Sequence, residues 1–518
     1  MTLPILTLLS PLAVLATALL AIRTPGRRPG RLPRIAEVSA IAALVLALAG
    51  LLQQIVAGSA AISTQGGLVG FRLDAISATM TSLVAFIGWI VVRYSRFYLD
   101  GEAREGAFHG WMLAGLGAVL LLVQAGSLPV LVAAFLAIGA ALRHLLRFYA
   151  ERPEARRAAA KFTLVWGLGD ATLVLATLLL AQAYGTVDIA TVSAAVTAKG
   201  LTPAAHAAVA LMVLTAVFKT AAFPLHGWLT EVMEAPTPVS ALLHAGIINS
   251  GGVLLILMAP LVQASPGAMA TLVMIGGFTA LFGGMVMLTQ SVVKTALAWS
   301  TVAQMGFMLL QCGLGLWPLA LLHIVAHSLY KAHAFLSSGG AVVAVLQARK
   351  PGPIAVPDLG AVARSFGLAL ALFTAVAWGF GFLAGPKSAQ ALALGAILIF
   401  GVAYLVAQGL ADAAPRALTL HTLRASLGTA VAYFALHIVA SALWGPGLPA
   451  APVAGPLEWA LIVLALLSFG LVAFAQALFP HWAHHPATAG LRVHVANGLY
   501  LNALLDRAIG GLKASRTH

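Results

Sequence analysis

Two histidines and a lysine follow one another at four-residue intervals inside a long apolar segment, HIVAHSLYKAHAF (323–335). Because four residues advance an α-helix by about 400°, His323, His327 and Lys331 fall on one helix face and span about 12 Å. A neutral imidazole accepts a proton on one ring nitrogen and releases one from the other, and a lysine kept from water can give up its proton. With water between groups about 6 Å apart, the spacing predicts a path for protons.

Further ionisable residues interrupt the other apolar segments of the chain. They are Asp74, Lys161, Asp170, Lys219, His244 and Lys294. Within a membrane such groups are costly and by default face protein or water, although snorkelling or a structural hydrogen bond is the commoner explanation for any single one. Lys219, His244, the 323–331 stripe and Asp170 lie many residues from the expected helix ends. We therefore expect this set to line an ion path.

The composition is that of a membrane protein. Of 518 residues, 61% are hydrophobic and 8% are charged, and the mean hydropathy is +0.98. Apolar segments near the length of about 20 residues that crosses a bilayer recur throughout, and we count roughly fifteen. The first of them has no basic residue before it, unlike a secretory signal, so we expect it to remain as a helix.

The net charge of +14 is concentrated in alternate loops. The basic residues of these loops are Arg27, Arg28, Arg31, Arg34, Arg93, Arg96, Arg104, Arg143, Arg147, Arg152, Arg156, Arg157, Arg349, Lys350, Arg416, Arg424, Arg492, Arg507, Lys513 and Arg516. By the positive-inside rule this pattern predicts a multi-pass membrane protein with the N-terminus outside and the C-terminus in the cytoplasm. It argues for contact with membrane lipids and against nucleic-acid binding.

Motifs of a self-contained enzyme or metal centre are not found in the sequence. The single cysteine, Cys312, cannot form an internal disulfide. The tract HWAHH (481–485) is better explained as a wet loop at the membrane surface than as a metal site. Without a nucleophile motif or a phosphate loop, we expect no catalytic residue and no cofactor in this chain.

Prolines and glycines predict two interrupted helices. Pro224 has no amide to donate to the carbonyl of Thr220, so a helix should break within about a turn of Lys219. Downstream, WGFGFLAGPKS (378–388) combines glycines with Pro386 and Lys387. Broken helices expose backbone and charge to a cavity in transporters, and a pair of them suggests an inverted repeat.

Three segments resemble the antiporter-like subunits of respiratory complex I and of multisubunit cation/proton antiporters. They are PLHGWLTEVMEAPTPVSALLHAG, KTALAWSTVAQMGFMLL and HIVAHSLYKAHAFLSSG, within a resemblance over about residues 60–400. The resemblance implies an all-α polytopic membrane protein, a bundle of fourteen or so helices with two inverted five-helix repeats and broken helices, and proton translocation. The expected regions are N-terminal helices 1–110, first repeat 111–263, second repeat 264–411, C-terminal helices 412–480 and a cytoplasmic tail 481–518.

The resemblance also assigns roles to residues. It places the lysine of the family's first broken helix at Lys219, the histidine that follows it at His244, and the aspartate that precedes both at Asp170. The histidines and the lysine of the family's discontinuous helix correspond to His323, His327 and Lys331. The lysine at the exit of the family's second broken helix corresponds more loosely to Lys387.

One position departs from this pattern. Leu136 stands where complex I subunits place the glutamate that pairs with the lysine of the broken helix. Lys219 then needs another acid. We predict that Asp170 contacts it directly or through one water, with Glu231 and Glu234 as second choices. The alternative is that Asp170 pairs with Lys161, nine residues earlier on the same helix but on the opposite face.

The stretch AFLAIGAALRHLLRFYAERPEA, the tail motif NGLYLNALLDR and the short C-terminus are similar to the DabB branch of this superfamily. The similarity implies a membrane subunit that uses a proton or sodium gradient to drive one-way hydration of carbon dioxide to bicarbonate. The implied partner is a DabA-like zinc protein of carbonic-anhydrase type on the cytoplasmic side, which would hold the zinc. The alternatives are a proton-pumping subunit of a quinone or membrane-hydrogenase complex and, from another class, a structural membrane anchor.

The C-terminal stretch 491–514 places Leu491, Val495, Leu499 and Ala503 at helical spacing, with basic residues between them. We therefore expect one amphipathic helix there, lying on the membrane surface or on the partner.

Overall fold

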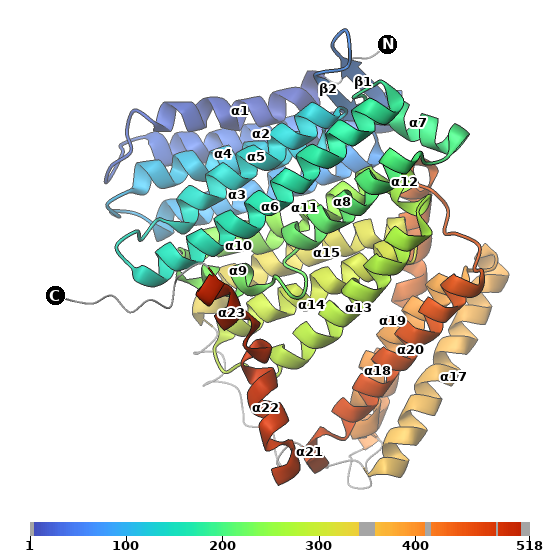
Figure 1. The fold of residues 1–518 in the computed structure, drawn as a ribbon. Helices are drawn as coiled ribbons and strands as arrows, with labels where there is room; N and C mark the ends of the chain where they lie inside the picture. Colours follow the sequence, from blue (N-terminus) through green and yellow to red (C-terminus); the bar gives the residue numbers. More distant parts are fainter. Residues whose placement is uncertain (1–4, 341–357, 410–415, 483–484, 509–518) are drawn as a thin grey trace.

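The computed structural model describes residues 5–340, 358–409, 416–482 and 485–508, and the long helices of the main bundle lie side by side in it (Figure 1). The helices of its N-terminal half are α1 (Ile5–Ala21), α2 (Leu32–Ala57), α3 (Ala75–Tyr98), α4 (Glu105–Val123), α5 (Leu128–Leu146), α6 (Pro153–Tyr184), α7 (Ile189–Lys199) and α8 (Pro203–Lys219). Short pieces follow the end of α8, namely α9 (Gly227–Thr230), η1 (Val232–Glu234), α10 (Thr237–Ala245), η2 (Ile247–Asn249), α11 (Ser250–Leu257) and α12 (Ala259–Gln263).

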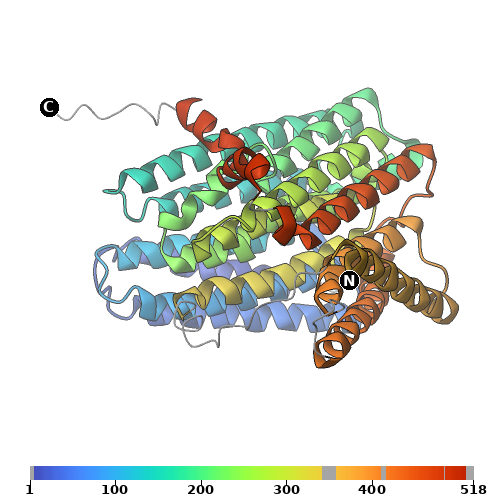
Figure 2. The same ribbon diagram turned by 90° about the horizontal axis from the view of Figure 1, so that it is seen from below.

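Three long helices complete the main bundle, and four more stand beside it. The first three are α13 (Pro266–Met287), α14 (Val293–Gly313) and α15 (Trp317–Leu336), after which comes η3 (Ser338–Gly340). The second group is α17 (Leu359–Ala384), α18 (Ala389–Gly409), α19 (Arg416–Trp444), η4 (Gly445–Gly447) and α20 (Pro456–Ala477). Figure 2, seen from below, shows α17 to α19 gathered at one corner of the molecule.

Eleven helices in the described ranges are long and apolar enough to cross a membrane, and four shorter apolar helices accompany them. The polytopic all-α fold is therefore confirmed, whereas the count of fifteen spans is not. The apolar core runs through the main bundle. The boundaries of the five expected regions and the inverted repeats stay predictions.

A small hairpin, β1 (Ala60–Ser63) and β2 (Gly70–Leu73), connects α2 to α3. Its strands pair antiparallel, with Ala60 opposite Leu73, and the backbone of Gly70 accepts a hydrogen bond from Gly126 (2.8 Å). The hairpin lies at the end of the bundle opposite the arginine-rich connections (Figure 1). Those connections contact one another, since the Arg104 guanidinium donates to the carbonyls of Arg147 and Phe148.

The first predicted helix break is confirmed, and the second is wrong. Helix α8 ends at Lys219, and the chain returns to helix only at Gly227. In contrast, 378–388 contains a turn between two long helices, with Gly385 at φ 80° after the end of α17. The helix that carries His323, His327 and Lys331 is also continuous rather than broken. An interruption that the sequence did not suggest occurs instead at η2, just after His244.

The tail is not one amphipathic helix. After α21 (Phe479–Trp482) and η5 (Pro486–Thr488), it forms α22 (Ala489–Ala496), η6 (Gly498–Tyr500) and α23 (Leu501–Ala508). Gly498, Leu499 and Tyr500 all have positive φ, which ends the helical path between Leu491 and Ala503. Arg349, Lys350, Lys513 and Arg516 lie outside the described residues.

Candidate functional site: buried lysines and histidines

Lys219 and Asp170 form a buried ion pair at the first helix break. The Lys219 ammonium donates to Asp170 Oδ1 (2.5 Å) and to the carbonyl of Trp166 (2.9 Å). The Lys219 side chain is fully buried, and that of Asp170 is 14% exposed. The predicted contact between Asp170 and Lys219 is therefore confirmed, and the alternative pairing of Asp170 with Lys161 is wrong.

Local sequence explains how the lysine reaches this acid. Lys219 is the last residue of α8, so its side chain leaves the helix next to backbone that the break has freed. On α6, Gly169 leaves room for the lysine stem, because a Cβ at that position would lie 2.9 Å from Lys219 Cε. The ammonium also lies 3.9 Å from the ring centroid of Trp166, a favourable cation–π position.

Helix α5 contributes aromatic and apolar surface rather than an acid. Leu136 is 49% exposed and faces away from the bundle interior. Its neighbour Phe135 is fully buried, with its ring centroid 5.3 Å from the Lys219 ammonium. Asp170 on α6 is therefore the acid that balances Lys219 in this chain.

His244 and Lys331 each contact one of two consecutive hydroxyl residues of α14. His244 Nδ1 is 3.0 Å from Thr301 Oγ1, and its ring stacks on Phe335 at 4.3 Å. The Lys331 ammonium donates to Ser300 Oγ and to the carbonyl of Leu297 (3.0 Å). Both side chains are fully buried, so neither reaches the membrane surface.

His323 and His327 continue this line along α15. The two rings lie 6.0 Å apart, and His323 Nδ1 is 2.9 Å from Gln311 Oε1. Among the described residues, no hydrogen-bond partner is found for either nitrogen of His327 or for Nε2 of His244 and His323. Buried polar atoms of this kind are sites for water, which is what a proton path along the helix requires.

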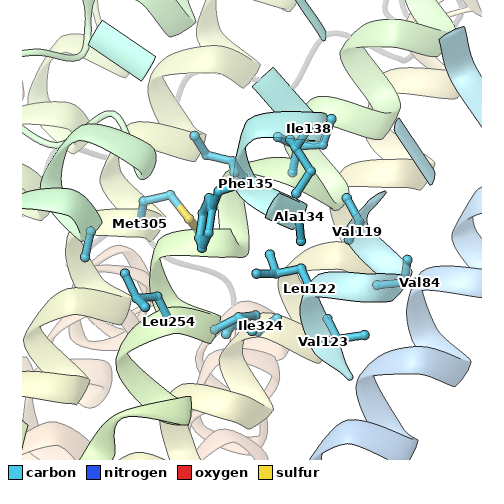
Figure 3. Close-up of a cluster of buried hydrophobic side chains, with 14 of the residues drawn as sticks. Val84, Val119, Leu122, Val123, Ala134, Phe135, Ile138, Leu254, Met305 and Ile324 are labelled. Carbon is cyan, nitrogen blue, oxygen red and sulfur yellow. The ribbon is translucent and has the colours of Figure 1, made fainter. Parts of the chain in front are cut away.

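An apolar cluster includes residues next to both Lys219 and the histidine helix. Figure 3 shows Phe135, Leu122, Leu254, Met305 and Ile324 among side chains that face one another from several helices. Phe135 contacts Lys219, and Ile324 follows His323 in the chain. The cluster therefore contributes apolar side chains to the region that contains both Lys219 and His323.

A second polar cluster surrounds Lys161, which is fully buried near the arginine-rich end of α6. Its ammonium contacts Glu231 Oε1 (2.5 Å), Asn502 Oδ1 (2.7 Å) and Asp506 Oδ1 (2.7 Å). Glu231 therefore pairs with Lys161 rather than Lys219. Glu234 is 40% exposed and pairs with Arg152 at 3.5 Å on the surface.

The remaining predicted residues lie at helix ends. Asp74 caps α3, accepts from the backbone of Ser77 and pairs with Arg72 at 3.1 Å beside a cavity of about 500 Å³. Lys294 is the second residue of α14 and donates to Thr237 Oγ1 (3.1 Å). Lys387 lies in the turn before α18. Near the start of α18, the Gln390 side chain donates a hydrogen bond to the carbonyl of Pro452. None of these contacts, among the described residues, connects them to Lys219 or His244.

Sequence reasoning missed Ser300, Thr301, Asn502 and Asp506. Thr301 follows Lys294 by seven residues, two helical turns on the same face, which was a usable signal for a polar stripe on α14. Asn502 and Asp506 are also four residues apart on one face, but nothing local indicated that this face binds Lys161.

Comparison with known proteins defines the class. Residues 125–352 match the family described as NADH:quinone oxidoreductase/Mrp antiporter, transmembrane, and residues 67–109 match the N-terminus of complex I chain 5. The Mrp complex of Dietzia sp. DQ12-45-1b has a similar fold, with a TM-score of 0.63 at 22% identity over 99% of this chain and 60% of that chain. The chain is thus an antiporter-like membrane subunit.

Among the relatives, the probable inorganic carbon transporter subunit DabB2 of Halothiobacillus neapolitanus is 37% identical over 90% of this chain and 85% of that protein. The corresponding DabB subunit of Hydrogenovibrio crunogenus is 43% identical over 56% of each chain. Subunit L of the NADH-quinone oxidoreductase of Mycobacterium tuberculosis is 32% identical over 85% of this chain and 70% of that one. The chain belongs to the DabB family.

Proposed function

We propose that this chain is the cation-conducting membrane subunit of an inorganic carbon pump, with the proton as its cation. The observation that carries the proposal is the buried Asp170–Lys219 pair, together with the His244, Lys331 and His327 group, in a chain related to DabB subunits along most of its length. A passive anchor has no use for so many buried ionisable groups.

The residues suggest how protons move. Lys219 exchanges a proton while Asp170 balances its charge, and His244 and Lys331 exchange protons through water beside Ser300 and Thr301. The apolar cluster of Phe135 and Met305 contributes side chains to the region that contains both stations. Lys161, Glu231, Lys294, Lys387, Glu234 and Asp74 stay candidates for the ends of the path.

The partner and the orientation belong to the same proposal. A DabA-like protein of carbonic-anhydrase type, holding the zinc, sits on the cytoplasmic side, and proton entry through this chain makes its hydration of carbon dioxide one-way. The arginine-rich connections face the cytoplasm of a bacterial inner membrane, and the N-terminus lies outside.

A second candidate is a proton-pumping subunit of a complex I or membrane-hydrogenase type assembly, which the 32% identity to subunit L favours. Affinity purification of the tagged chain from its native membrane separates the two. Recovery of one large zinc protein with carbon dioxide hydration activity supports the pump, and recovery of redox subunits supports the alternative.

The tail offers a first test of partner binding. Leu491, Val493 and Leu504 are 58%, 51% and 62% exposed, so they present apolar surface beyond the bundle. Deletion of 491–518 is expected to reduce recovery of the partner roughly tenfold, since an interface loses its anchor residues. Unchanged recovery and unchanged carbon accumulation would remove the tail from partner binding.

The hydroxyl of Thr301 offers a test of the histidine station. Thr301→Val keeps the shape but removes the partner of His244 Nδ1, and we expect accumulation of inorganic carbon to fall about tenfold. Thr429→Val is the matched control, because that hydroxyl bonds to the carbonyl of Ala425 within its own helix. Equal uptake by the two variants would show that this hydrogen bond is not used.

A further inference from the structure

We infer that the C-terminal segment 498–506 is a working part of the ion path, in which Asp506 and Asn502 position the Lys161 ammonium against Glu231. The inference rests on the proposed function and extends it to the tail. This segment begins 268 residues after Thr230, the end of the short helix α9 at the first helix break. Asp506 and Asn502 are positioning residues, because they act on the ion through Lys161 and Glu231.

The contacts are dense and balanced in charge. The Lys161 ammonium is fully buried and reaches one oxygen each of Glu231, Asn502 and Asp506. The Asn502 amide also donates to Glu231 Oε1, so one side chain bonds both members of the Lys161–Glu231 pair. Arg157 Nε lies 4.0 Å from Asp506 Oδ1. Two cations thus face two carboxylates, and Asp506 supplies half of the negative charge.

The tail is held on the broken-helix region by close backbone fits. A Cβ at Gly227 would lie 2.3 Å from Asn502 Oδ1, so only glycine admits the amide at this distance. Gly498, at φ 57°, lies against Trp299 and near His226 Nε2. The Gln290 side chain donates to the carbonyl of Ala496 (3.2 Å). The tail therefore packs on one surface, which is formed by the loops after α8 and α13 and by the start of α14.

The position of this cluster suits an exit station, because the proposed orientation puts the arginine-rich end in the cytoplasm. Lys161 precedes Asp170 by nine residues on α6, which places it about 13 Å closer to the arginine-rich end. Glu231 follows the same break that frees Lys219. Its Oε2 is buried without a hydrogen-bond partner among the described residues, so it can take up a proton or a water. Without Asp506, the cluster would hold two cations and one carboxylate, and the uncompensated positive charge beside Lys161 would be costly in this buried place.

Docking is tested by a cysteine pair in the full chain. An added Cβ at Gly227 would lie 3.5 Å from Asn502 Cβ, within the range of a disulfide. Gly227→Cys with Asn502→Cys, in a Cys312→Ser background, should cross-link in membranes under mild oxidation. Gly227→Cys with Leu504→Cys and Asn502→Ala is the control, because Leu504 is 62% exposed on the same helix and the alanine removes the amide that a Cβ at position 227 would meet. Absence of the cross-link in the first pair, or equal cross-linking in both, would overturn the docked position.

Function is tested by charge at position 506. Asp506→Asn should lower inorganic carbon accumulation roughly tenfold in assembled complexes. Two other variants should keep most of the accumulation, namely Asp506→Glu and Asp506→Asn combined with Arg157→Gln. In each of them the cluster has equal numbers of positive and negative charges. Arg507→Gln, an exposed charge change on the same helix, should have no effect. A merely structural tail would not be rescued by removing Arg157.

Lys219→Met is measured in parallel so that the two proposals can fail separately. If Lys219→Met is inactive and Asp506→Asn accumulates carbon like the unsubstituted protein, the role of the tail is refuted and the ion path stands. If Lys219→Met is fully active, the proposed function is refuted, and this inference, which rests on it, is refuted as well.

Discussion

Replacing Lys219 or Lys331 by alanine is expected to lower inorganic carbon accumulation by roughly a hundredfold or more, the scale on which positioned proton-transfer groups act. Both ammonium groups are buried, one against Asp170 and one against Ser300, and alanine leaves no proton-carrying group at either position. Uptake of radiolabelled inorganic carbon by cells that depend on the pump is the measurement.

Arginine should not rescue either position, because a guanidinium does not release its proton at accessible pH. Lys199→Ala, at the exposed end of α7, is the control and should leave uptake unchanged. Recovery of the partner with the variants shows that assembly is intact. Normal uptake by assembled Lys219→Ala and Lys331→Ala complexes would refute a role for these lysines in transport.

The second large effect concerns stability. Asp170→Leu leaves the Lys219 ammonium buried without its acid, and we expect a loss of about 3–5 kcal/mol in unfolding free energy. Adding Lys219→Met removes the stranded charge, so the double variant should regain most of that stability while remaining inactive. Thermal unfolding of the purified complex in detergent measures both changes.

Glu234→Gln provides the comparison, since its pair with Arg152 is on the surface at 3.5 Å. Such pairs contribute about 0–1 kcal/mol, and the variant should unfold almost like the unsubstituted protein. A double variant no more stable than Asp170→Leu alone would contradict the account, because the pair would then act through more than its charge.

Local chemistry made several features predictable from sequence. Pro224 removes one backbone donor, and the helix duly ends at Lys219. The missing acid at Leu136 pointed to Asp170, because a buried ammonium needs a counter-charge and few carboxylates lie in apolar segments. The four-residue spacing of His323, His327 and Lys331 places them on one helix by geometry alone.

Other features depend on contacts that local patterns do not encode. The tail carries helical spacing through Leu499, yet positive φ at Gly498–Tyr500 redirects it so that Asn502 and Asp506 reach Lys161. Glycine and proline near Lys387 mark a turn between helices rather than a break within one, and the two alternatives look alike in sequence. The interruption at η2 follows His244 without a proline to announce it.

Uptake by proteoliposomes that contain the purified complex tests the central claim most directly. With an imposed proton gradient, unsubstituted complex should accumulate radiolabelled inorganic carbon, and a protonophore should abolish that accumulation. Complex that carries Lys219→Met should accumulate no more inorganic carbon than unsubstituted complex treated with the protonophore. Accumulation by Lys219→Met that equals that of unsubstituted complex and still collapses with the protonophore would contradict the account, because the gradient would then act through groups other than Lys219.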